Sequence, residues 1–220
     1  MLEFSPDTPA PVRELALACA AFVQKAVGVE LDLTPDTLPL LDHYLSLARD
    51  GKGEVHALVA AAAGAYFGEV VRMQYPSRWA LPAVGDGDDR DAWRLEFEQV
   101  FLYLYPVALA GEALDRGHAT DHAASAPSAP SAHAAAARDG GFSVREQDRP
   151  ALVAALELLG SVDEDEYYLL STRFDVLASV ADRLIALRQR ELRVEELPSI
   201  APDVYARAID DDSARPQRSS

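Results

Sequence analysis

The sequence predicts an α+β protein that is mostly helical, with N-terminal helices, a small antiparallel sheet and a C-terminal helical hairpin in that order. Two patterns carry this prediction. Apolar residues recur at three- and four-residue spacing over several long segments, which is typical of amphipathic helices. Around residues 92–98, apolar and charged residues alternate, which is typical of a half-buried strand. With 220 residues, 49% of them hydrophobic, the chain is long enough to bury a core.

Three helices are predicted before the sheet. The first covers residues 12–27, where apolar residues keep the helical spacing. The second begins at Thr34, whose hydroxyl is expected to accept a hydrogen bond from the first free amides. Pro35 suits the first helical position, and Gly51 marks the end of this helix. The third helix covers residues 54–74.

The third helix carries the most distinctive segment of the chain. Gly64 and Gly68 lie four residues apart, so they share one face of the helix. A glycine inside a helix costs about 1 kcal/mol relative to alanine, so we expect another backbone to approach this face closely. Glu69 follows on the same largely apolar helix. We expect it to form a buried ion pair with Arg72, one turn on, or with Arg78 beyond the helix.

The predicted sheet begins after this helix. Residues 78–84 and 92–98 are expected to form a hairpin or two strands of a small sheet, separated by a turn-rich acidic run. Residues 100–105 are continuously apolar and aromatic, so they fit either a third strand or the start of a helix. Pro106 then opens a short helix that ends near Gly117.

The chain divides into four parts at these elements. Residues 1–117 hold the first helices and the sheet. Residues 118–141 are rich in alanine, serine and proline and lack large apolar side chains, so a flexible linker is predicted. Residues 142–195 are predicted to form a helical hairpin packed on the first part, because its apolar face must be covered. Residues 196–220 are polar and predicted to be mostly disordered.

Two helices make up the predicted hairpin. The first covers residues 149–159 and is capped by Asp148. The second begins at Asp163, which resembles a capping box with Glu166, and runs as one long helix to about Leu192. Its apolar residues keep a three- and four-residue spacing along the whole length.

The charge of the chain limits its partners. There are 36 acidic and 20 basic residues, giving a formal net charge of −16. A field of this sign repels nucleic acids and anionic membrane surfaces and attracts basic partners. We therefore expect a protein partner rather than a nucleic acid or a membrane.

The cysteine content and the N-terminal sequence favour the cytoplasm. Cys19 is the only cysteine and lies in an apolar run, so it fits a small buried side chain in a reducing compartment. The first residues lack the basic and apolar regions of a signal peptide. Arginine outnumbers lysine 18 to 2 and alanine is abundant, which indicates a GC-rich bacterial genome.

No catalytic, metal or cofactor site is predicted. His118 and His122 have the spacing of a zinc-binding pair, but they lie in the predicted linker and lack the glutamate that such a pair requires. The acidic run at 86–91 departs from the order of a calcium-binding loop. The sequence contains no nucleophile elbow, phosphate-binding loop or dinucleotide-binding glycine motif. These absences favour a non-catalytic protein.

One segment resembles a known motif. The stretch Gly-Ala-Tyr-Phe-Gly-Glu-Val-Val-Arg at residues 64–72 is followed six residues later by Arg78 and Trp79. It resembles a motif of uncharacterised bacterial α+β proteins, in which a Gly-x-x-x-Gly-Glu helix precedes a tryptophan-bearing strand. The resemblance covers roughly residues 30–106. It implies no particular reaction, and it suggests an accessory or immunity-type partner. The motif residues, with a functional or a packing role, are Gly64, Gly68, Glu69, Arg72, Arg78 and Trp79.

Three functions remain open from the sequence. The first is a non-catalytic interaction or accessory protein of a bacterial cytoplasm, which binds a protein partner through an acidic or aromatic surface. The second is a small enzyme or ligand-binding protein with a pocket near Glu69. The third is a nucleic-acid mimic or immunity-type inhibitor. The aromatic interface residues expected for the first function are Trp93, Phe97, Tyr103 and Tyr105.

Overall fold

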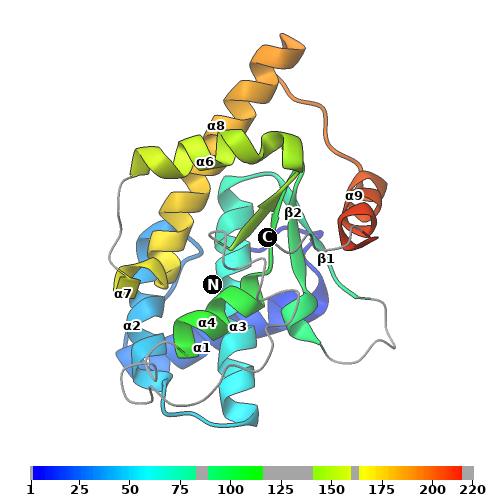
Figure 1. The fold of residues 1–220 in the computed structure, drawn as a ribbon. Coiled ribbons are helices and arrows are strands. Elements are labelled where there is room, and N and C mark those ends of the chain that lie inside the picture. The colour runs from blue at the N-terminus through cyan, green and yellow to red at the C-terminus, as the bar shows by residue number, and fades with distance from the viewer. Residues whose placement is uncertain (1, 83–88, 116–140, 160–163, 215–220) are drawn as a thin grey trace.

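The computed structural model describes residues 2–82, 89–115, 141–159 and 164–214, and it confirms a mostly helical α+β fold (Figure 1). The predicted linker up to residue 140 and most of the acidic turn lie outside the described residues. In chain order the elements are α1 (Ala10–Val27), η1 (Pro35–Thr37), α2 (Leu38–Ala48), α3 (Glu54–Gln74), β1 (Ser77–Ala80), η2 (Arg90–Ala92), β2 (Arg94–Phe97), β3 (Leu102–Leu104), α4 (Pro106–Asp115), β4 (Phe142–Val144), η5 (Glu146–Asp148), α6 (Arg149–Leu159), α7 (Glu164–Tyr167), α8 (Leu170–Leu192) and α9 (Pro202–Ala214).

Helix α3 lies at the centre of the fold. Residues 59–71 are buried without interruption, and the helix packs against α1 and α4. A helix that is apolar on every face is typical of a protein core or a membrane span. By length and composition alone α3 would be long enough to cross a membrane, but 72% of its most apolar window is buried within the protein. This burial is what a core helix requires.

The sheet is antiparallel, and its strands follow one another in the order β1-β2-β3-β4. Residues 100–105, for which strand and helix were both open, contain strand β3. Strand β4 was not predicted, because its three residues are too few to show an alternating pattern. The register places Arg78, Glu96 and Tyr103 in one row on the outer face of the sheet. The side chains that alternate with this row face the core.

The two glycines of α3 lie where neighbours approach closely. A Cβ on Gly64 would be 2.7 Å from the carbonyl oxygen of Pro106 and would overlap the backbone of Val107. The expected backbone approach is therefore confirmed at Gly64, where the partner is the start of α4. At Gly68 the neighbour is a side chain instead, because a Cβ there would overlap the indole ring of Trp79.

The prediction that the Thr34 hydroxyl caps the helix is wrong. The Thr34 hydroxyl donates a hydrogen bond to Asp32 Oδ1 at 2.6 Å and accepts none from the helix amides. The turn before α2 is held from α3 instead. Tyr66 Oη accepts a hydrogen bond of 2.8 Å from the amide of Leu33 and lies 3.0 Å from the Thr37 hydroxyl. Leu33 has a positive φ of 63°, a conformation that leucine rarely adopts without such support.

The long helix predicted from Asp163 to Leu192 is interrupted. Asp163 lies outside the described residues, α7 ends at Tyr167, and α8 begins at Leu170. The apolar spacing continues across the interruption, so the sequence pattern gives no sign of it. The break changes which groups cap the longer helix.

Helix α8 is capped by a residue from another helix. Asp42 of α2 accepts hydrogen bonds from the amide of Leu170 at 2.7 Å and from the amide and hydroxyl of Ser171 at 3.1 and 2.6 Å. A carboxylate at this position satisfies amides that have no partner inside the helix. Burial raises the pKa of Asp42, although the hydrogen bonds from Ser171 oppose this shift.

The C-terminal segment predicted to be mostly disordered contains an ordered helix. In α9 the side chain of Tyr205 is 0% exposed. Leu197 and Ile200, in the segment that precedes α9, are also buried. These apolar side chains are few and widely spaced, so the composition of the segment resembles that of a disordered tail. Figure 1 shows α9 beside the strands, apart from the main group of helices.

We predict that Gly64→Ala destabilises the protein by about 1–3 kcal/mol, because the added methyl group forces α3 and α4 apart. Gly111→Ala in α4 is the matched control. A Cβ there would meet only Ala60 Cβ, at 4.0 Å, so this variant should be neutral or up to about 1 kcal/mol more stable. Urea unfolding measures both free energies. Equal stability of the two variants would contradict the close packing at Gly64.

We predict that the stability advantage of the native protein over Asp42→Asn shrinks as the pH rises. The pKa of Asp42 is raised on folding, so the native state binds the proton more tightly than the unfolded chain does. The contribution of protonated Asp42 to the free energy of unfolding is fully present below the ordinary aspartate pKa of 3.8. This contribution is lost as the pH rises through the higher pKa of Asp42 in the folded protein. Unfolding free energies at a series of pH values measure this difference, and a gap that widened with pH would refute it.

Candidate functional site

Glu69 is enclosed in a buried network. Its side chain is 1% exposed and accepts hydrogen bonds from Thr8 Oγ1 at 2.9 Å, Arg72 Nη1 at 3.1 Å and Trp79 Nε1 at 2.7 Å. Both carboxylate oxygens are therefore used within the protein. Of the two expected partners, Arg72 is the one that pairs with Glu69.

Arg72 extends the same network to two other segments. Its guanidinium donates to the Ser77 carbonyl at 3.1 Å and to Asp7 Oδ2 at 2.8 Å. The network thus joins the N-terminal segment to α3 and to β1. A buried ion pair with its hydrogen bonds satisfied costs a great deal to break, which suits a role in fixing these three segments.

Arg78 pairs with a different carboxylate. Its Nε donates to Glu96 Oε2 at 3.1 Å, and Arg94 binds the other oxygen, Oε1, through Nε at 2.9 Å and Nη2 at 2.6 Å. Glu96 is 2% exposed in the middle of the outer sheet face. The guanidinium of Arg94 also lies 5.6 Å from the ring centre of Tyr103. Arg78 of β1 thus pairs with Glu96 across the two strands, and Arg94 pairs with Glu96 along β2.

The aromatic residues expected at an interface contribute mostly to the interior. Trp93 is 8% exposed and Phe97 1% exposed, and both belong to the main core. Tyr103 and Tyr105 are half-buried, with ring centres 5.9 Å apart in an edge-to-face arrangement. The described structure therefore separates these four residues. Tyr103 and Tyr105 lie on the outer face of the sheet, whereas Trp93 and Phe97 face the core and leave little surface for a partner to contact.

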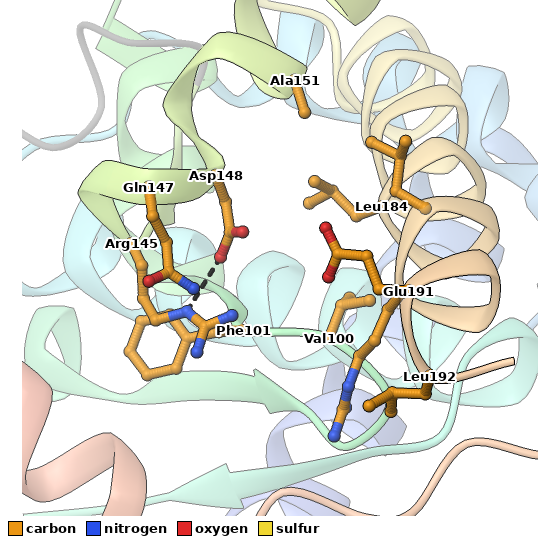
Figure 2. A pocket seen from close by; sticks show the side chains of 11 residues that line it. Val100, Phe101, Arg145, Gln147, Asp148, Ala151, Leu184, Glu191 and Leu192 are labelled. Atoms are coloured by element: carbon orange, nitrogen blue, oxygen red, sulfur yellow. Dashed lines mark hydrogen bonds and ion pairs between the residues drawn. The ribbon is translucent and has the colours of Figure 1, made fainter.

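A pocket lies elsewhere, between the start of α6, the C-terminal half of α8 and loop 98–101 (Figure 2). Its volume is about 290 Å³. The apolar part of its lining comes from three distant segments of the chain, and its members are Val100, Phe101, Ala151, Leu184, Leu187 and Leu192. No motif marked this pocket in the sequence. Its residues come together only when β2 and β3, η5 and α8 are in place.

Charged groups line the same pocket. Arg145 Nε donates to Asp148 Oδ2 at 2.8 Å, as Figure 2 shows, and its guanidinium lies 5.5 Å from the ring centre of Phe101. Arg188 donates from Nη1 to the backbone carbonyl of Gln99. Glu191 also lines the pocket. The cavity therefore combines an apolar lining with two arginines and two carboxylates.

Loop 98–101 forms one wall of this pocket and is held from outside by α9. The Tyr205 hydroxyl lies within hydrogen-bonding distance of the carbonyl oxygens of Phe97 at 2.7 Å and Val100 at 2.8 Å, and it accepts from the amide of Leu102 at 3.1 Å. The rings of Tyr205 and Phe101 stack with centres 4.3 Å apart. Phe101 therefore contacts α9 on one side and lines the pocket on the other. Burial raises the pKa of Tyr205, so its hydroxyl keeps its proton.

The loop is also fixed through its backbone. The amide of Ile200 donates to the carbonyl of Glu98 at 2.8 Å, and the Ser199 hydroxyl donates to the Glu98 side chain at 3.0 Å. The segment between α8 and α9 thus runs along the loop. The shape of the pocket wall depends on groups from the C-terminal segment.

The described residues were compared with two kinds of reactive site, a metal-binding cluster and an accessible thiol. Within residues 2–82, 89–115, 141–159 and 164–214, no group of three or more His, Cys, Asp or Glu side chains is placed to hold a metal ion. His118 and His122 lie outside that part of the chain. Cys19 is buried, as expected, and burial raises the pKa of its thiol, which removes it from nucleophilic chemistry.

Comparisons of the chain with models of known protein families, with curated proteins and with solved structures give no match.

We predict that Tyr205→Phe loosens α9 and loop 98–101 together. The buried carbonyl oxygen of Phe97 would lose the hydroxyl donor, and that of Val100 would keep only the amide of Leu102, which costs about 1–3 kcal/mol. Hydrogen–deuterium exchange should accelerate in both segments and in the residues around Phe101. Val204→Ala, a neighbouring exposed position on α9, is the control and should leave exchange unchanged. Faster exchange in α9 alone would show that the helix and the pocket wall are independent.

Proposed function

We propose that the protein is a non-catalytic binding protein, an accessory protein of a bacterial cytoplasm, that holds a segment of a partner protein in the pocket between α6, α8 and loop 98–101. The observation that carries this proposal is the pocket itself. It offers buried aliphatic groups of Val100 and Leu184 at its base, and it contains no nucleophile paired with a base.

The size and surroundings of the pocket support a protein segment as its occupant. A volume of about 290 Å³ lies just below the range for small-molecule pockets, about 300–1,000 Å³, which suits a side chain better than a large cofactor. Leu192 at the rim is 48% exposed, and Val194, two residues on, is 40% exposed. Exposed apolar groups beside a pocket are typical of surfaces that bind other proteins.

The alternative pocket near Glu69 has less support. Its carboxylate is 1% exposed and is saturated by Thr8, Arg72 and Trp79. A ligand would have to displace hydrogen bonds that are already satisfied, which is expensive in a buried site. We therefore assign Glu69 a structural role within this proposal.

Filling the pocket tests the proposal. Ala151→Leu on α6 places additional carbon atoms in the cavity, and it is expected to reduce the captured amount of a stoichiometric partner at least tenfold. Ala154→Leu is the matched control, because it makes the same change one turn along α6, outside this pocket. Affinity capture from the native host with the wild-type chain and both variants measures the effect.

A second measurement locates the binding surface. Hydrogen–deuterium exchange of the complex should show protection at 145–151 and 184–192. Equal capture by both variants, protection confined to another surface, or the absence of any stoichiometric partner would overturn the proposal.

A further inference from the structure

We propose that the pocket selects a segment in which an aliphatic side chain stands beside a lysine or arginine, with Glu191 as the group that pairs with the cation. This inference rests on the proposed function and deepens it, because it states the chemistry of the occupant. Four charged side chains line the cavity: Arg145, Asp148, Arg188 and Glu191.

The first two charges neutralise each other. Arg145 donates to Asp148 across 2.8 Å, and its guanidinium packs over Phe101. Both side chains stand on the η5 side of the pocket, and the ion pair fixes their positions. A charged group of a ligand gains little from binding there, because Arg145 and Asp148 already neutralise each other.

Arg188 is committed to the loop. Its Nη1 donates to the Gln99 carbonyl, so the guanidinium is directed at the backbone of loop 98–101, and the side chain is half-buried. A carbonyl oxygen carries only a partial charge, so an anionic ligand would still be attracted to Arg188. Tighter binding of an anionic probe than of a cationic one would identify Arg188 as the selecting group.

Glu191 is the remaining charged group. Within the part of the chain that the structure describes, no hydrogen bond or ion pair is recorded for it, and its side chain is exposed. Figure 2 shows its carboxylate directed into the space between α8 and the start of α6. It stands in the last turn of α8, where the negative end of the helix dipole also favours a cation. The cation site is therefore directly beside the aliphatic lining.

The charge of the whole chain acts in the same direction. The formal net charge is −16, so a basic segment is attracted from a distance and an acidic one is repelled. An exposed ion pair contributes little affinity by itself, so the aliphatic contact supplies most of the binding and Glu191 supplies the selectivity. The expected preference is accordingly modest, roughly two- to fivefold.

Three probes with straight alkyl chains of similar length test the inference: n-hexylguanidinium, 1-hexanol and hexanoate. Each is titrated into the full-length protein and followed by amide NMR shifts of residues around Leu184 and Leu187. We expect n-hexylguanidinium to bind roughly two- to fivefold tighter than 1-hexanol, and hexanoate to bind weakest. A guanidinium keeps its charge throughout the accessible pH range, so no titration of the probe complicates the comparison.

Two variants separate the local charge from the overall field. Glu191→Gln should lower the affinity for n-hexylguanidinium to about that for 1-hexanol. Glu14→Gln, at an exposed position of α1, removes the same formal charge away from the pocket and should retain the preference. A preference that survives Glu191→Gln would assign the selectivity to the overall charge and overturn the role of Glu191.

The outcomes distinguish the two proposals. If none of the three probes shifts the pocket residues, the proposed binding function fails and the inference fails with it. If 1-hexanol binds in the pocket but hexanoate binds as well as or better than n-hexylguanidinium, Arg188 is the selecting group. The binding function then stands and only the inference about the cation is overturned.

Discussion

The burial of α3 on all of its sides is the constraint on which the rest of the structure depends. Residues 59–71 have no solvent-facing side, so α1, α2 and α4 all pack against one helix, and Trp79 of β1 contacts it at Gly68. That packing is possible only because Gly64 allows the backbone at the start of α4 to come close. The close approach fixes where Pro106 lies and therefore where β3 ends. The position of the strands, and of loop 98–101 between them, follows from the centre of the fold.

Buried polar side chains join the ends of the elements to this centre. Asp42 caps α8 from another helix, Glu69 joins the N-terminal segment to β1, and Tyr205 holds loop 98–101. Asp42 binds amides that α8 leaves without a partner, Tyr205 binds backbone groups of loop 98–101, and Glu69 binds side chains. The bonds from Asp42 to Leu170, from Glu69 to Thr8 and from Tyr205 to Val100 span 128, 61 and 105 residues of the chain. Removing one partner from such a contact leaves a buried polar group unsatisfied, which is more expensive than losing a surface bond. Apolar packing in the core determines which helices lie against each other, and these polar contacts fix the ends of the helices and strands relative to the core.

Local patterns in the sequence were sufficient for most of the helices and for two of the strands, but not for β4, α9 or the pocket. The bounds of α3 and α6 could be predicted, because spacing, prolines and glycines act within a few residues. The pairing of Glu69 with Arg72 was also accessible, since one helical turn separates them. The break before Leu170 was missed because its cap comes from Asp42, and α9 was missed because only scattered apolar side chains such as Tyr205 hold it. The pocket combines three distant segments, so no spacing reveals it.

The contact between Tyr205 and loop 98–101 also has a consequence for the order of events during synthesis. The bonds from Tyr205 reach back 103 to 108 residues, to Phe97, Val100 and Leu102. A chain that emerges from the ribosome N-terminus first makes the strands long before it makes the helix that fastens the loop between them. One wall of the pocket therefore acquires its final shape only when the C-terminal helix has left the ribosome. A nascent chain therefore contains all four strands before it contains the helix that fixes this wall of the pocket.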